Sequence, residues 1–167
     1  MSATRCLSAA AVALSLAFAA ALVLVGCGGS DGPAAESPPR LTRPQLVHRL
    51  GEVCQEHTDR QVVAIERFDR KHGIPYGARH ERATAAQREE ELVKVILPIV
   101  RDTIHDLEGL RPPRKQEADF RGFLRALEHG VAYSERDPGW VVDAAPEPFA
   151  EARELSWKLG TALCGQA

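Results

Sequence analysis

The sequence lacks the patterns of the common catalytic and nucleotide-binding sites. No strand pattern leads into a Gly-x-Ser-x-Gly elbow, so the nucleophile of an α/β-hydrolase is not expected. No glycine-rich run follows a strand, which excludes a phosphate-binding loop. Positive charge is not in excess either, because the formal net charge at pH 7 is −2, and a basic surface for nucleic acid or anionic lipid is not expected. We therefore predict no catalytic residue, no cofactor and no nucleic-acid partner, and expect a protein that is not an enzyme.

The N-terminal 26 residues have the pattern of a secretory signal. Arg5 supplies positive charge near the start, and the apolar run Ala9–Val25 contains no charged side chain. The four residues Leu24–Cys27, at the end of this run, resemble the lipobox of bacterial lipoproteins. This resemblance implies cleavage before Cys27, a diacylglyceryl thioether on its sulfur and often a further acyl chain on the new amino group.

Lipidation at Cys27 predicts where the protein lies and how the chain is divided. Two acyl chains give stable membrane attachment, so we expect a lipid anchor at the extracytoplasmic face of the cell membrane. Residues 1–26 are then the signal peptide, residues 27–43 the lipidated Cys and a flexible linker rich in Gly, Ser and Pro, and residues 44–167 a single domain. The alternative is an uncleaved transmembrane helix, because the apolar run approaches the roughly 20 residues that span a bilayer.

The other cysteines predict a disulfide. Cys6 leaves with the signal peptide, and Cys54 and Cys164 remain as an even pair in an oxidising compartment. We expect these two residues to be joined. Closing a loop of about 110 residues would contribute on the order of 4 to 5 kcal/mol through the entropy of the unfolded chain. The alternative is two buried free thiols.

Helical periodicity dominates from Pro44 onward, and no alternating strand pattern bounded by hairpin turns is present. A bend is expected at Pro98, which lies inside a helical pattern. Four amphipathic segments with short breaks predict an all-α fold, an antiparallel four-helix bundle in which the first and fourth helices are neighbours. The predicted helices cover residues 44–72, 84–108, 114–134 and 147–159.

Each predicted helix has one apolar face. The face of the first helix contains Cys54 and extends to Phe68. In the third helix, Gly122 and Gly130 lower the helix propensity by about 1 kcal/mol each. The face expected for the second helix comprises Leu92, Val95, Ile96, Ile99, Val100, Thr103 and Leu107.

The C-terminal segment carries a second resemblance. Phe149, Ala152, Leu155, Leu159, Gly160 and Cys164, together with an early cysteine, resemble the small secreted or lipidated helical proteins common in actinobacteria. Arg far outnumbers Lys, which suits a GC-rich genome. Members of this group mostly lack an assigned activity, so the resemblance implies no catalytic residue.

Metal binding is the main chemical alternative. Ferritin-like bundles carry carboxylate-x-x-His pairs, and Asp69 with His72 and Asp102 with His105 have this spacing, with Asp in place of Glu. His105 is expected to point away from the apolar face of its helix, and inward Glu residues are not evident on the other helices. We expect these groups to be solvated and assign no metal. The same interpretation applies to His48, Glu52, Glu56, Glu89, Glu90 and Glu91.

Two aromatic residues, Trp140 and Tyr76, lie in segments expected between helices. Apolar residues in loops often form a contact surface, although such residues also plug the ends of helical bundles. The leading interpretation is a non-enzymatic binding or interaction module of the cell envelope, whose partner is an unknown envelope protein or ligand. The alternatives are a metal-binding or enzymatic helical bundle and a purely structural envelope protein.

Overall fold

The computed structural model describes residues 39–75, 79–144 and 147–161, which belong to one unit, Ser37–Ala167. All the regular structure of these residues is helical, and no strand occurs in this described part of the chain. The all-α prediction is therefore confirmed. None of the helices in the described ranges is both long and apolar enough to cross a membrane.

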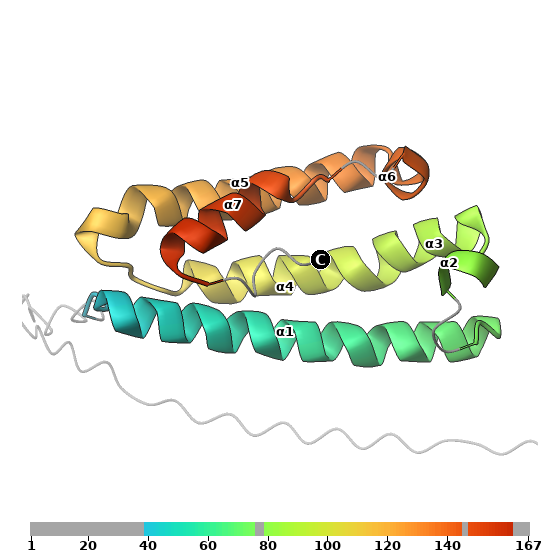
Figure 1. Ribbon diagram of the computed structural model, residues 1–167, viewed down its shortest axis with the longest axis horizontal. Helices are drawn as coiled ribbons and strands as arrows, with labels where there is room; N and C mark the ends of the chain where they lie inside the picture. The colour runs from blue at the N-terminus through green and yellow to red at the C-terminus, as the bar shows by residue number, and fades with distance from the viewer. Residues whose placement is uncertain (1–38, 76–78, 145–146, 162–167) are drawn as a thin grey trace, which may run out of the picture. The chain divides into compact units, whose positions relative to one another are not determined.

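The first helix, α1, spans Arg43–His72, and its bounds follow from local chemistry (Figure 1). Thr42 caps its N-terminus through a capping box with Gln45. Pro44 occupies the first turn, where a missing N–H is tolerated. Gly73 ends the helix with a φ of +67°, in the left-handed region that glycine adopts without strain. The predicted first helix is thus confirmed to within one residue.

The second predicted helix is one continuous stretch made of three parts. They are α3 (Ala85–Glu91), the π-helical segment η1 (Leu92–Ile96) and α4 (Leu97–Glu108). Thr84 caps the stretch through a capping box with Gln87, as its spacing predicts. A short helix that was not predicted, α2 (Arg79–Arg82), precedes it.

The π-helical segment coincides with the proline that interrupts the pattern. Pro98 has no N–H to donate to the carbonyl of Lys94, and its ring crowds the same carbonyl in a regular α-helix. The backbone N–H of Leu97 instead donates to the carbonyl of Leu92, five residues earlier. The disturbance expected from Pro98 therefore takes the form of a wider helical turn directly before it.

The third predicted helix corresponds to the 3₁₀ turn η2 (Arg114–Gln116) and α5 (Glu117–Arg136). The segment after this helix was predicted to contain no helix before residue 147. This prediction is wrong in part, because α6 (Pro138–Ala144) follows α5 almost directly. Pro138 starts this helix in the position where proline is tolerated, and the Trp140 N–H donates to the Asp137 carboxylate at 3.0 Å. The last helix, α7, covers Ala150–Leu159 and begins three residues later than predicted.

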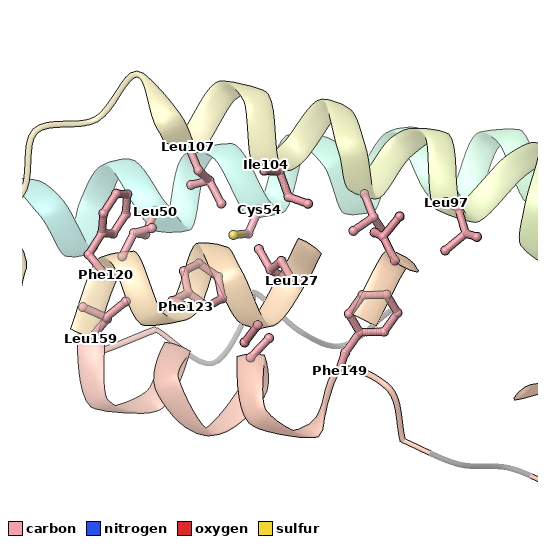
Figure 2. Close-up of a cluster of buried hydrophobic side chains, with 14 of the residues drawn as sticks. Leu50, Cys54, Leu97, Ile104, Leu107, Phe120, Phe123, Leu127, Phe149 and Leu159 are labelled. Carbon is pink, nitrogen blue, oxygen red and sulfur yellow. The ribbon is translucent and has the colours of Figure 1, made fainter. Parts of the chain in front are cut away.

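The helices pack in chain order. Helix α1 contacts α4, α4 contacts α5, and α5 contacts α7 (Figure 1). Cys54 projects from α1 toward the side chains of α5 (Figure 2). Leu97 and Ile104, which the predicted face of the second helix omitted, are buried with them. The main core cluster comprises Leu46, Leu50, Cys54, Leu92, Leu97, Val100, Ile104, Leu107, Phe120, Phe123, Ala126, Leu127, Val131, Phe149, Ala152 and Leu159.

Candidate functional site

The predicted site residues are only partly within the described chain. Cys27, Tyr76 and Cys164 lie outside the described residues. Cys54 is buried, with 4% of its surface exposed, on the face of α1 where it was expected. Lipidation of Cys27 and the disulfide between Cys54 and Cys164 therefore stay predictions.

Trp140 lies on α6 and not in a loop, and 54% of its surface is exposed. Its indole Nε1–H donates to the hydroxyl oxygen of Tyr133 at 2.9 Å. The guanidinium of Arg136 lies 5.6 Å from the centre of the Tyr133 ring, within the range of a cation–π contact. The alternative that Trp140 plugs the end of a bundle is wrong, and its indole is available for contact. Trp157 on α7, which sequence reasoning did not single out, is 61% exposed.

The carboxylate-x-x-His pairs are only partly solvated. His105 is exposed, as its position on the helix predicted. Asp69 is only 7% exposed and Glu91 only 4%, so the expectation of a solvated side chain is wrong for both residues. His72 stacks on Phe68 with ring centres 4.2 Å apart. Within the described ranges, no group of three or more His, Cys, Asp and Glu side chains is placed to hold a metal ion.

A polar cluster between α1 and α4 is organised around a buried histidine, His57, which is 3% exposed. His57 Nε2 lies 2.8 Å from the Asp106 carboxylate, and Nδ1 lies 3.2 Å from an Arg60 nitrogen. Because arginine only donates, Nδ1 accepts and Nε2–H donates, which defines the tautomer. Arg60 also donates to Asp102 at 2.6 Å. Both ring nitrogens of His57 are thus satisfied.

Sequence reasoning missed this cluster, although a spacing signal was present. His57 and Arg60 are three residues apart on α1, and Asp102 and Asp106 are four residues apart on α4. Each pair therefore shares one helix face. Only the pairing of α1 with α4 shows that the two faces meet.

The same helices form a groove of about 350 Å³ next to this cluster. Its apolar lining comes from Ala64 and Phe68 on α1, from Val95 in η1, and from Pro98 and Ile99 on α4. Val95 lies in the π-helical segment, and such segments occur frequently at functional sites. The groove therefore has an apolar lining and an unusual backbone geometry on one side.

Basic side chains surround the groove. Arg60, Arg67 and Lys71 line it from α1, Lys94 lines it from η1, and Asp102 is the only carboxylate among the described lining residues. Arg67 and Lys71 make no ion pair with any residue that the structure describes, whereas Arg60 is bound to Asp102. Net charge did not indicate this local positive excess, because acidic side chains elsewhere on the chain offset it.

Glu90 lies beside this basic group and partly compensates it. Lys94 Nζ donates to the Glu90 carboxylate at 3.0 Å. This hydrogen bond, assisted by the positive charges of Lys94 and Lys71, lowers the pKa of Glu90 below its ordinary value, although desolvation acts in the opposite direction. Glu90 is therefore ionised at neutral pH and neutralises Lys94, while Arg67 and Lys71 keep an excess of positive charge.

Comparison of the chain with protein-family models, with curated proteins and with solved structures finds no match in any of the three. The candidate site is therefore defined by its geometry alone.

Replacing His57 with alanine is expected to lower the free energy of unfolding by about 2 kcal/mol, since two hydrogen bonds to charged groups and a buried ring are lost. Equilibrium unfolding in urea measures the change. The control is His105→Ala, because His105 is exposed on α4. That variant should stay within about 0.5 kcal/mol of the unchanged chain. Equal effects of the two substitutions would contradict a structural role for His57.

Proposed function

We propose that the protein is a lipid-anchored, non-enzymatic binding module on the extracytoplasmic face of the cell membrane. The groove between α1 and α4 is the observation that supports binding, because it combines an apolar lining with unpaired positive charge. The run Leu24–Cys27, with its resemblance to a lipobox, supports the anchor. In this proposal the folded helices hold a ligand or an envelope partner close to the membrane.

We also propose that α1, the α3–α4 stretch, α5 and α7 form an antiparallel four-helix bundle. Successive helices are neighbours, which is the packing expected when short connections join antiparallel helices. The end of α7 returns to α1, because a Cβ built at Gly160 would lie 3.0 Å from a methyl group of Val47. This contact supports the adjacency of the first and fourth helices.

The anchor is tested by mass spectrometry of the protein purified from its native host. We expect a mature chain that starts at Cys27 and carries acyl chains, found in the membrane fraction. Cys27→Ala should abolish acylation and prevent signal removal at this site. Cys6→Ala is the matched control, since Cys6 lies in the predicted signal peptide and its replacement should change neither mass nor location. An unmodified Met1 amino terminus on the purified chain would refute the lipoprotein proposal.

A further inference from the structure

We propose that the groove between α1 and α4 binds a single-chain amphiphile with an anionic headgroup, namely a medium-chain fatty-acid anion. The inference rests on the proposed function and names the ligand chemistry of its binding groove. Three features of the described residues support it: the placement of the cations, the apolar lining between them, and the size of the groove.

The cations are distributed unequally along the groove. Helix α1 runs antiparallel to the continuous stretch from α3 to α4 (Figure 1). His57 in α1 lies against Asp106 in α4, whereas His72, at the C-terminal end of α1, lies near Glu90 in α3. Arg60 and Asp102 therefore mark one end of the groove and compensate each other at 2.6 Å. The headgroup site is at the other end.

Arg67, Lys71 and Lys94 lie toward that second end. Lys94 is hydrogen-bonded to Glu90, whereas Arg67 and Lys71 find no ion-pair partner among the described residues. Arg67 and Lys71 are also exposed, so a ligand anion reaches them without any rearrangement of the helices. A carboxylate at this end gains two charge-assisted interactions and displaces no internal ion pair.

The apolar lining continues from the cations toward Arg60. Phe68 is buried, and Ala64, Val95 and Ile99 are half-buried, so their remaining apolar surface is turned toward the groove. The segment of α1 from Ala64 to Lys71 is about 10 Å long at 1.5 Å per residue, which matches an extended chain of about eight carbons. This stretch accommodates a hydrocarbon chain that extends away from a headgroup held by Arg67 and Lys71.

The size of the groove favours a small amphiphile over a flat bilayer surface. Its volume of about 350 Å³ lies at the lower end of the roughly 300–1,000 Å³ typical of small-molecule sites. A bilayer surface would meet the cations through many headgroups and would leave the apolar lining unfilled. A single chain with one charged end uses both features.

The test is photocrosslinking with octanoate that carries a diazirine group. The full chain is expressed in its native host, and the cell fraction that contains it is incubated with the probe and irradiated. Mass spectrometry then locates the labelled residues. We expect labels on α1 near Phe68 and on α4 near Ile99, with competition from unlabelled octanoate but not from octanol at the same concentration.

Matched variants test the role of the cations. Arg67→Gln combined with Lys71→Gln should reduce labelling about tenfold, as expected when two partly exposed ion pairs are lost. Lys115→Gln combined with Lys158→Gln removes the same charge from exposed positions outside the groove and should leave labelling unchanged. Ala64→Trp, which fills the groove without changing charge, should also abolish labelling at Ile99. Circular dichroism checks that each variant is folded.

The outcomes separate this inference from the proposed function. Equal labelling of the two double variants, equal competition by octanol, or labels restricted to another surface such as that around Trp140 would overturn the groove assignment. Labelling that requires anionic phospholipid vesicles would also overturn it, in favour of a bilayer contact. If the purified chain carries no lipid at Cys27, the proposed anchored module is refuted. The labelling experiment on the groove remains a separate measurement and tests the ligand proposal independently.

Discussion

Gly130→Ala is expected to lower the free energy of unfolding by about 3 kcal/mol, the upper part of the usual range for overpacking. Gly130 lies on α5 where α7 begins, and Phe149 packs directly over its Cα. A Cβ at this position would overlap the Phe149 ring and would approach the carbonyl oxygen of Pro148 to 2.9 Å. The segment from Pro148 to α7 must therefore move, which disturbs the contact between α5 and α7.

Gly122→Ala is the matched control on the same helix. A Cβ at Gly122 meets a methyl group of Leu155 at 3.6 Å, which is ordinary van der Waals contact. This substitution should therefore raise stability by about 0.5 to 1 kcal/mol, because alanine has the higher helix propensity. Equilibrium unfolding in urea compares the two variants. A Gly130→Ala variant as stable as Gly122→Ala would contradict the packing of Phe149 on α5.

The two glycines show what could be predicted from the sequence and what could not. Helix propensity predicts the same destabilisation of the helix for Gly122 and Gly130, since it depends on residue type alone. Only the position of Phe149, nineteen residues after Gly130, distinguishes them. The helix that contains both was predicted correctly, because helical periodicity and the flanking proline and glycine signals are local.

Errors in the fold also occurred where local signals compete. Residues 135–146 were predicted to separate two helices, yet the chain begins α6 at Pro138 because a proline is tolerated in a first turn. A bend was predicted at Pro98, and the structure has the π-helical segment η1 directly before this proline, a form that depends on which backbone carbonyls remain accessible. Local rules therefore located both disturbances without determining the resulting backbone.

The groove and the cluster around His57 were missed because both require two helices. Arg60, Arg67 and Lys71 recur at helical spacing on α1, but periodicity alone does not show that Ile99 faces them. The burial of His57 depends in the same way on the placement of α4 against α1. Faces of single helices were predictable, whereas sites formed between helices followed from the structure.

Removal of the predicted disulfide between Cys54 and Cys164 should have the largest effect on stability. We expect the free energy of unfolding to fall by about 4 to 5 kcal/mol, because the unfolded chain regains the conformational entropy of a loop of roughly 110 residues. The described residues make this pairing geometrically reasonable. Gly160, at the end of α7, approaches Val47 on α1, and Cys54 lies seven residues, or about 10 Å, further along the same helix. Thr161 is buried, and the three residues from there to Cys164 span up to about 10 Å.

The measurement compares urea unfolding of the mature chain, which starts at Cys27, with and without reductant, alongside the double variant Cys54→Ala with Cys164→Ala. Reduction should destabilise the unchanged chain, whereas the double variant, already without the bridge, should show no further change on reduction. If Cys54 and Cys164 of the unfolded, unreduced mature chain react with a labelling reagent, both residues are free and the predicted bridge is wrong. In that case the stability of the protein must come from the core around Phe123 and Leu107 without a covalent link, because these side chains are fully buried at the centre of the helical packing.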